Sequence, residues 1–387
     1  MDKPDIKTQI EGYAQLLHEN ETLRKYALDR TVQKGQVAAA VNRLHPATLE
    51  LRVSRIIKET ASTATLRLVA ADGGYLPPFM AGQYINLCVD IAGIRTSRPY
   101  SISSPPSQTA YYDITVRRVP EGFVSLYLLD EIKTGQLFTS TSPTGTFYHN
   151  PLFHGDDLVY IAGGSGITPF MSMLREVTDR GQDRKIHLIY GSRSEDDIIF
   201  AAELQQRAAS HDNLTVTTVI SEPSPAYTGP AGFITGDLLR KLLSDLGGKM
   251  FYICGPEVMY TFVKTELAGL AIPGRRIRIE VYGPPTDVTT QPGWPEDIRA
   301  DDRFKVTLPG GDVIPVSAGE PLMVGLERAG LTLNTSCRSG ACSLCRTLLR
   351  AGKVFHAPGA KLRKSDSISG YIHPCMAYPL TDLELLI

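Results

Sequence analysis

The 387-residue sequence is short of cysteine, of net charge and of long apolar runs. Six cysteines in so long a chain argue against a disulfide framework, which is typical of short secreted domains. The formal net charge of −1 gives no sign of a nucleic-acid partner. Gly, Pro or charged residues interrupt every apolar stretch before it reaches the length of a membrane span. Residues 1–5 also lack the apolar core of a secretory signal. We therefore expect a cytoplasmic protein with no membrane span.

Four of the cysteines form a pattern. Four residues separate Cys337 from Cys342, two separate Cys342 from Cys345, and Cys375 follows much later. This C-x₄-C-x₂-C…C spacing is that of plant-type [2Fe–2S] proteins. Zinc is the main alternative, but zinc sites usually pair two C-x₂-C units, and only one is present. Small residues suit a loop whose backbone N–H groups point at cluster sulfurs, and here they are Ser336, Ser339, Gly340, Ala341 and Ser343. The spacing predicts metal ligation by these four cysteines, and hence a protein that carries electrons. The other two cysteines are expected to be free thiols.

The length predicts two or three domains, preceded by a helical extension over residues 1–48. Ile6, Ile10, Tyr13 and Leu17 recur at helical spacing with mostly polar residues between them. Such a helix could dock on a partner or pack on the body of the protein, and we favour packing. His45-Pro46 is expected to close the segment.

From Leu49 the hydrophobic period changes to two. Short alternating runs follow one another with Gly and Pro clusters between them, which predicts a closed antiparallel β-barrel over residues 49–153. Within this range lies Arg98-Pro99-Tyr100-Ser101. On an extended strand these residues can offer one ligand a phosphate-binding guanidinium, an aromatic cover and a hydroxyl. The same letters also occur in ordinary half-buried strands.

Near Asp156 the pattern changes to strand, loop and helix. The apolar run at residues 158–162 is typical of a parallel strand buried on both faces. It leads into Gly163-Gly164-Ser165-Gly166-Ile167-Thr168-Pro169, in which Thr168 is the expected N-cap and Pro169 the first helical residue. Glycines at a helix N-terminus let a phosphate approach the backbone. An ordinary glycine turn remains the alternative, because the G-x-G-x-x-G fingerprint is absent.

Three further strands are predicted at residues 186–190, 214–220 and 250–253. The loops after them contain Ser192-Arg193, Glu222 and Cys254-Gly255-Pro256. Strands that alternate with helices predict a doubly wound parallel sheet over residues 154–282, whose ligands bind at the carboxyl ends of the strands. All these loops lie at that edge, which favours a nucleotide site.

The C-terminal part reads as a linker and a small domain. Residues 283–300 are rich in proline and poor in apolar residues, as linkers are. A hairpin over 304–316, a short helix over 322–329 and a last strand near Leu383 predict a compact α+β domain over residues 301–387.

Taken in order, these motifs resemble the ferredoxin–NADP reductase superfamily, in the arrangement with a plant-type ferredoxin at the C-terminus. The resemblance covers nearly the whole chain from Leu49 and says nothing of the N-terminal extension. It implies a flavin-binding barrel, an NAD(P)-binding α/β domain and a β-grasp ferredoxin domain. Many family members have glycine where this chain has Ser343, which bears on the amide pattern around the sulfurs.

The resemblance assigns roles to the flavin motifs. It implies that Arg98 holds flavin phosphate, that Tyr100 stacks on the isoalloxazine and that Ser101 bonds its N5. The other predicted flavin-binding residues are Pro99, Val116, Gly122, Val124 and Ser125. The E-x-[FY] piece, Glu280 and Tyr282, is implied to approach the flavin from the far side.

The same resemblance assigns the nucleotide motifs. The residues implied to bind the nicotinamide dinucleotide are Gly163, Gly164, Gly166, Thr168, Pro169, Ser192, Arg193, Glu222, Cys254, Gly255 and Pro256. Cys254 is implied to lie by the nicotinamide ring. Tyr100, Ser101, Cys254 and Glu280 are thereby the predicted catalytic residues.

The implied function is electron transfer from nicotinamide through a flavin and a [2Fe–2S] cluster to a protein acceptor, expected to be a metalloenzyme. FAD is expected, with FMN as the alternative, because the loop at Gly122 could bind a phosphate of either. NADH is favoured over NADPH, since Glu222 suits a free 2′-hydroxyl, although Arg193 argues the other way.

The identity of the acceptor and the oligomeric state stay open. Residues 301–387 hold ten basic and eight acidic side chains, and Arg338 and Arg346 flank the cysteines, which suggests an acceptor with an acidic face. Two other functions remain. One is a small-molecule reductase. The other is an electron-transfer subunit of a larger complex, ranked low because the known subunits have a shorter gap before the fourth cysteine.

Overall fold

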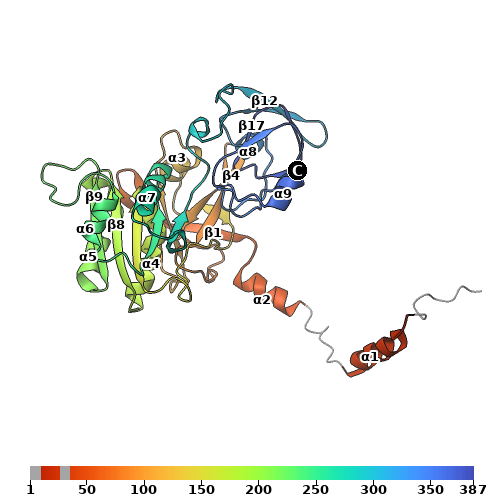
Figure 1. Cartoon of the computed structure of the whole chain (residues 1–387), viewed down its shortest axis with the longest axis horizontal. Coiled ribbons are helices and arrows are strands. Elements are labelled where there is room, and N and C mark those ends of the chain that lie inside the picture. The colour runs from red at the N-terminus through yellow and green to blue at the C-terminus, as the bar shows by residue number, and fades with distance from the viewer. Residues whose placement is uncertain (1–9, 27–34) are drawn as a thin grey trace, which may run out of the picture. The chain divides into compact units, whose positions relative to one another are not determined.

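The computed structural model describes residues 10–26 and 35–387, and the chain divides into two units, Met1–Leu44 and His45–Ile387 (Figure 1). The first unit holds α1 (Tyr13–Tyr26) and α2 (Gln36–Leu44), neither of which buries a residue. The predicted helical extension is therefore confirmed for these ranges, and α2 ends directly before His45. Ile6 lies outside the described residues. In the described part of the chain, no helix is long and apolar enough to cross a membrane.

The predicted antiparallel barrel is confirmed. Six strands pair in the order β4-β3-β6-β1-β2-β5, and these strands are β1 (Leu49–Thr60), β2 (Thr63–Ala70), β3 (Tyr84–Ile91), β4 (Ile94–Ser101), β5 (Tyr112–Arg117) and β6 (Leu137–Ser140). Every pairing in this sheet is antiparallel. Its two edges meet where Ile102 bridges Ile114, so the sheet curls closed. The inward residues of the alternating pattern fill the barrel, and the short helix α3 (Phe123–Asp130) follows β5.

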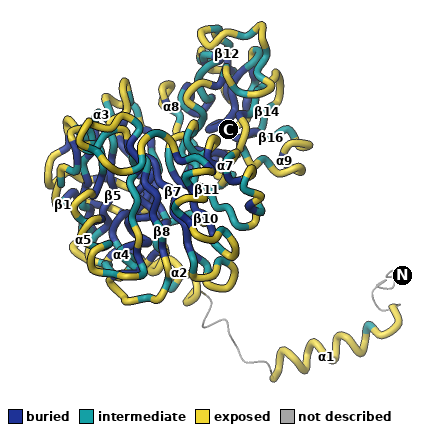
Figure 2. The backbone as a smooth tube through the Cα atoms, turned by 60° about the vertical axis from the view of Figure 1, so that its left-hand side comes forward, coloured by how far each residue is buried: buried dark blue, intermediate teal, exposed yellow. Residues whose placement is uncertain are grey.

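The predicted doubly wound parallel sheet is also confirmed. Its strands are β7 (Asp157–Gly163), β8 (Lys185–Ser192), β9 (Leu214–Ile220), β10 (Met250–Cys254) and β11 (Ile277–Glu280), in the order β11-β10-β7-β8-β9. One apolar core joins α4 (Ile167–Asp179) and α5 (Ala201–Ser210) to the sheet, and a second joins α6 (Gly236–Leu242) and α7 (Glu257–Gly269). Strands β7 and β10, which lie between these cores, are almost wholly buried (Figure 2). The strand order reverses between β7 and β10, which is where such sheets bind ligands.

The start of α4 differs from the prediction. The helix begins at Ile167 with Gly166 as its N-cap, directly after a 3₁₀ turn over Gly164–Gly166. Because of this 3₁₀ turn, the helical winding begins before Thr168, the predicted N-cap. The Thr168 hydroxyl instead donates a hydrogen bond to the Ser165 carbonyl at 2.7 Å. Pro169 still lies in the first helical turn, where its missing N–H leaves no helical bond unmade.

The C-terminal α+β domain has the predicted hairpin, helix and last strand. Its mixed sheet has the order β13-β12-β18-β14-β16, from β12 (Arg303–Thr307), β13 (Val313–Ser317), β14 (Thr347–Ala351), β16 (Tyr371–Ile372) and β18 (Leu383–Leu386). Helix α8 (Leu322–Arg328) packs on this sheet. The remaining elements are the pair β15 (Val354–His356) and β17 (Ala377–Pro379) and the short helix α9 (Lys364–Ile368).

Residues 283–300, predicted as a linker, lie against this domain. Val288 is buried in one core with Cys345 and Cys375. The Trp294 ring packs edgewise on Phe355 with 5.3 Å between centroids. Two apolar side chains thus anchor a segment whose composition is otherwise that of a loop. The exact domain boundaries stay predictions, and each of the three large sheets falls inside one predicted range.

Candidate functional site

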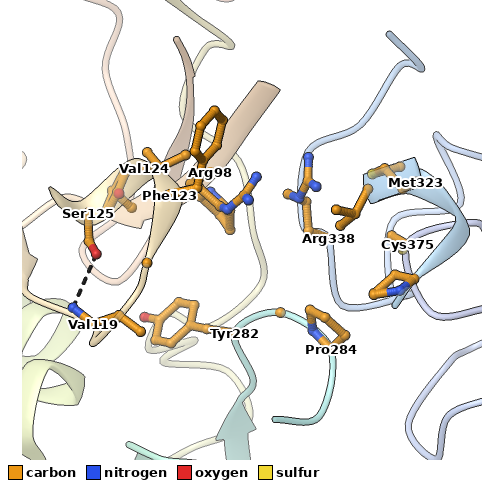
Figure 3. A pocket seen from close by; sticks show the side chains of 16 residues that line it. Arg98, Val119, Phe123, Val124, Ser125, Tyr282, Pro284, Met323, Arg338 and Cys375 are labelled. Carbon is orange, nitrogen blue, oxygen red and sulfur yellow. Dashed lines mark hydrogen bonds between the residues drawn. The ribbon is translucent and has the colours of Figure 1, made fainter. Parts of the chain in front are cut away.

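A cavity of about 380 Å³ lies between the barrel and the ferredoxin domain, a volume in the range of small-molecule sites (Figure 3). The predicted flavin-binding residues that line it are Arg98, Pro99, Tyr100, Gly122, Val124, Ser125 and Tyr282. The opposite wall belongs to the ferredoxin domain and includes Met323, Arg338 and Cys375. The flavin motifs and the fourth predicted cluster cysteine therefore share one cavity. Val116 does not line it, because this side chain is buried in the barrel core.

Arg98 reaches this cavity from β4 and is half-buried. Its Nη1 donates to the Thr96 hydroxyl and to the Ser97 carbonyl, both at 2.7 Å. Neither partner carries charge. Burial lowers the pKa of Arg98 to about 10, and the guanidinium of Arg338 is the second cause. An anionic ligand at this place would compensate the buried cation.

The second flavin motif forms the start of α3. Gly122 is the N-cap, and a Cβ there would lie 2.5 Å from the Ser125 Oγ and 2.9 Å from the Val119 carbonyl oxygen, so only glycine fits. The Ser125 hydroxyl accepts a bond from the Val119 N–H at 3.1 Å, drawn dashed in Figure 3. The first-turn residues of α3 line the cavity, and the free N–H groups of such a turn suit a phosphate.

Ser101, Cys254 and Tyr282 converge although they come from three separate segments. The hydroxyls of Ser101 and Tyr282 are hydrogen-bonded, and the Cys254 thiol lies 3.5 Å from the same Tyr282 oxygen. Burial raises the pKa of Cys254 well above its ordinary range, so this group is a thiol at neutral pH. Burial also raises the pKa of Glu280 to about 8, with Cys337 as a second cause.

A second cavity, of about 320 Å³, lies at the carboxyl edge of the parallel sheet. The predicted nucleotide-binding residues that line it are Gly163, Gly164, Ser192, Arg193 and Pro256. Gly166 lies behind it, where a Cβ would meet the Cys254 carbonyl oxygen at 2.2 Å. The glycine loop after β7 and the loop after β10 thus touch at the reversal of strand order. Thr168 and Pro169 are buried in α4, and neither they, Gly255 nor Glu222 line the cavity.

The residues of this second cavity that sequence reasoning missed include Arg117, Phe233 and Met259. Arg117 ends β5 of the barrel, yet its Nη1 would lie 2.7 Å from a Cβ at Gly164 in the neighbouring domain. It also pairs with Asp197. The two adjacent arginines Arg117 and Arg118 at the end of a strand could have indicated an anion-binding site. The sequence pattern did not indicate which domain they would face.

The cluster loop has the predicted amide pattern. The Cys337 sulfur accepts from the N–H groups of Ala341 and Cys342, both at 3.3 Å, and of Ser339 at 3.5 Å. Hydrogen bonding from the Cys342 thiol and these amides lowers the pKa of Cys337 to about 5. The Cys345 and Cys375 sulfurs lie 3.4 Å apart. The thiols therefore gather in two pairs.

Two pairs of thiols suit two irons that each take two thiolates. Across residues 10–26 and 35–387, no group of three or more His, Cys, Asp or Glu is arranged to hold a single metal ion. The observation that fits a [2Fe–2S] cluster is the pairing of Cys337 with Cys342 and of Cys345 with Cys375. All six cysteines, which lie in the described part, are free thiols.

Arg338 does not face solvent, which corrects one expectation. The side chain is 5% exposed and forms a two-pronged ion pair with Glu327, with N–O distances of 2.6 and 2.9 Å. It therefore cannot meet an acceptor protein. Arg346 does remain at the surface, where it bonds Asp366 at 3.0 Å.

Comparison with known proteins agrees with this geometry. Residues 48–149 match the Oxidoreductase FAD-binding domain, residues 160–265 the Oxidoreductase NAD-binding domain, and residues 306–380 the 2Fe-2S iron-sulfur cluster binding domain. The glycine betaine monooxygenase reductase subunit of Pseudomonas aeruginosa is 30% identical over 347 residues, covering 87% of this chain and 94% of that protein. The chain belongs to the ferredoxin–NADP reductase superfamily.

Two further proteins are similar to this chain over most of its length. NADH oxidoreductase HCR of Escherichia coli is 28% identical over 338 residues, covering 87% of this chain and 96% of that one. The solved structure of phthalate dioxygenase reductase covers 88% of the chain with a TM-score of 0.66 and 24% identity, and 97% of that chain is matched. The predicted superfamily, its three-part fold and its FAD, NAD and [2Fe–2S] domains are thus confirmed.

Proposed function

We propose that this superfamily member is an NADH-dependent reductase whose flavin and [2Fe–2S] groups deliver electrons to a partner metalloenzyme. One observation carries the proposal, namely that Cys375 and the Arg98–Tyr100 strand line the same cavity. When bound, a flavin accepts a hydride as an electron pair and an iron–sulfur cluster carries one electron at a time, so the two groups together convert between these chemistries. The protein would position the two groups and set the electrostatic environment around them.

Each side chain at the cavity has a task in this proposal. Arg98 and the first turn of α3 would hold the flavin phosphate, and Tyr100 would cover the ring. Ser101 would hold a hydrogen bond to the ring edge. Tyr282 contacts both Ser101 and Cys254, and in this position it would exclude water from the flavin ring before the nicotinamide binds.

The nicotinamide dinucleotide would lie along the second cavity. Gly163 and Gly164 leave room for the pyrophosphate beside the start of α4, and Arg117 adds a cation from the barrel. The carboxylate of Glu222 suits the free 2′-hydroxyl of NADH. Among the relatives, the name NADH oxidoreductase HCR agrees with this choice.

The acceptor is proposed to be an oxygenase, because the Pseudomonas aeruginosa relative is named as the reductase subunit of a monooxygenase. The exposed residues nearest the cysteines are candidates for the docking face. Leu344, between Cys342 and Cys345, is 55% exposed, and the nearby Arg346 offers a positive charge. Free thiols throughout support a cytoplasmic location.

The proposal is tested with anaerobically purified protein mixed with NADH in a stopped-flow spectrometer. Wild-type protein should lose flavin and cluster absorbance in succession. A Cys342→Ala variant should still reduce its flavin and a two-electron dye but should fail to reduce cytochrome c. Cys88→Ala, in the barrel and away from both cavities, is the matched control. Full cytochrome c reduction by Cys342→Ala would point to a small-molecule reductase, and a colourless wild-type protein would overturn the proposal.

A further inference from the structure

The interface between β4 and the ferredoxin domain buries an unbalanced set of charges. Arg338 and Glu327 are each 5% exposed, and Arg98 is half-buried beside them. These three side chains thus carry two positive charges and one negative charge. A buried excess of positive charge is costly unless an anion offsets it.

Hydrogen bonds join these three residues into one chain. Glu327 receives both prongs of Arg338 and, at 2.9 Å, the hydroxyl of Thr96. That hydroxyl in turn accepts from Arg98 at 2.7 Å. The carboxylate of Glu327 therefore accepts hydrogen bonds from Arg338 of its own domain and from Thr96 of the barrel. Both arginines line the 380 Å³ cavity, whereas Glu327 does not.

Figure 3 shows the guanidinium groups of Arg98 and Arg338 facing one another across this cavity. The lowered pKa of Arg98, to which Arg338 contributes, agrees with their closeness. Two facing guanidiniums whose one shared carboxylate, Glu327, does not line the cavity form a site for a dianion.

The position of Arg338 is fixed by its own backbone conformation and by contacts between the cluster loop and the barrel. Its φ of 51° lies in the left-handed region, which is unfavourable for a residue other than glycine. The two residues before Cys337 are held by β3, because Asn86 donates to the Thr335 carbonyl at 2.8 Å and the hydroxyls of Ser336 and Tyr84 are bonded. The cluster loop thus delivers Arg338 to the cavity in a fixed pose.

We propose that Arg338, supplied by the ferredoxin domain, is the second arm of the flavin-phosphate site. The inference rests on the flavin role proposed for Arg98. It makes the flavin a bridge between two domains, so that its binding also secures the cluster loop on the barrel. Glu327 is then a positioning residue that aims Arg338 at the phosphate.

The test compares FAD with riboflavin, which has the same ring system and no phosphate. Cluster-containing full-length protein, freed of flavin, is titrated with each ligand and followed by quenching of flavin fluorescence. The variants are Arg338→Gln, Arg338→Lys and the double variant Glu327→Gln with Arg338→Gln, which removes both members of the buried ion pair together. The matched control is Glu320→Gln with Arg328→Gln, because this pair has the same two-pronged geometry on the same domain, with both distances 2.7 Å, and lies outside the cavity.

We expect Arg338→Gln and the double variant to weaken FAD binding about tenfold or more, while riboflavin affinity stays within about twofold of wild type. Arg338→Lys should recover part of the FAD affinity. Cluster absorbance checks that each variant is folded. Equal losses for FAD and riboflavin, or no loss for either, would overturn the inference and leave Arg338 a structural residue. Wild-type protein that binds neither ligand would instead overturn the proposed function.

Discussion

Arg193 and Glu222 form an ion pair, with 3.0 Å between Nε and Oε2, that joins the loops after β8 and β9. The backbone joins them as well, since the Glu222 N–H donates to the Arg193 carbonyl at 2.8 Å. Arg193 lines the nucleotide cavity and Glu222 does not. The two residues whose charges argued for opposite nucleotides are therefore paired with each other.

The first prediction concerns nucleotide preference. Glu222→Ala removes a negative charge and frees Arg193 to bind the 2′-phosphate of NADPH. We expect the ratio of kcat/KM for NADPH to that for NADH to rise about tenfold, which corresponds to about 1.4 kcal/mol. Steady-state rates with a two-electron dye measure both values. Asp237→Asn, which breaks the exposed pair with Arg240 elsewhere on this domain, should leave the ratio unchanged. A constant ratio in Glu222→Ala would show that the pair does not select the nucleotide.

The second prediction concerns the point where Ser101, Cys254 and Tyr282 meet. Ser101→Ala removes the hydroxyl predicted to face the flavin edge and leaves Arg98 and α3 in place. We expect the rate constant for flavin reduction by NADH to fall by about ten- to a hundredfold while FAD remains bound. Stopped-flow absorbance gives the rate and the flavin spectrum gives occupancy. Ser54→Ala, on the barrel strand β1, removes a hydroxyl bonded to the Arg67 carbonyl and serves as the control. An unchanged reduction rate would remove Ser101 from the catalytic set.

The third prediction concerns the contact between the two nucleotide loops. A Cβ at Gly166 would meet the Cys254 carbonyl oxygen at 2.2 Å, and this backbone atom cannot move without shifting β10. Gly166→Ala should destabilise the protein by about 1–3 kcal/mol and raise the KM for NADH. Gly269, at the end of α7, has open space around it, so Gly269→Ala should be neutral or mildly stabilising. Urea unfolding and steady-state kinetics measure both effects. Equal stability of the two variants would contradict the close approach.

Local patterns predicted the three sheets well, because the spacing of apolar residues within each strand or helix indicates both its type and its buried face. The first three cysteines and the glycine loop were likewise predictable, because the residues of each motif lie close together in the sequence. Two of the misses, Arg117 and Arg338, share a cause. Arg117 and Arg338 each face a neighbouring domain. The spacing of apolar residues along the chain does not indicate which domain surfaces will contact each other. Thr168 was misplaced because a 3₁₀ turn began the winding before the cap signal.

The fourth prediction concerns Ser343, at the position where many family members have glycine. Its φ of 58° lies in the left-handed region, which costs a non-glycine residue on the order of 1 kcal/mol. Ser343→Gly removes this strain at the centre of the cluster loop. We expect a higher Tm and slower loss of cluster absorbance on heating. Ser367→Gly, inside the exposed side of helix α9, is the opposite control and should destabilise. A lower Tm for Ser343→Gly would show that its side chain stabilises the loop by more than the strain costs.

The fifth prediction concerns acid sensitivity of the ferredoxin domain. Burial lowers the pKa of His356 from 6.5 to about 4, with His373 as the second cause. The folded state therefore binds this proton less readily than the unfolded state. Stability from the neutral ring is fully present above pH 6.5 and is lost as the pH falls from there toward about 4. The loss is on the order of 3 kcal/mol when complete.

Replacing the ring by an uncharged amide separates this effect from other acid effects. His356→Gln cannot titrate in this range, so its urea-unfolding free energy should fall less steeply with acidity than that of wild type. The two curves should diverge in slope between pH 6.5 and about 4 and run parallel above that window. His18→Gln, on the exposed surface of α1, should follow wild type throughout. Because the His356 variant also loses packing, its absolute stability will be lower than that of wild type above pH 6.5. Only the slope tests the argument, and parallel curves across the whole range would mean that the buried ring does not govern the acid response.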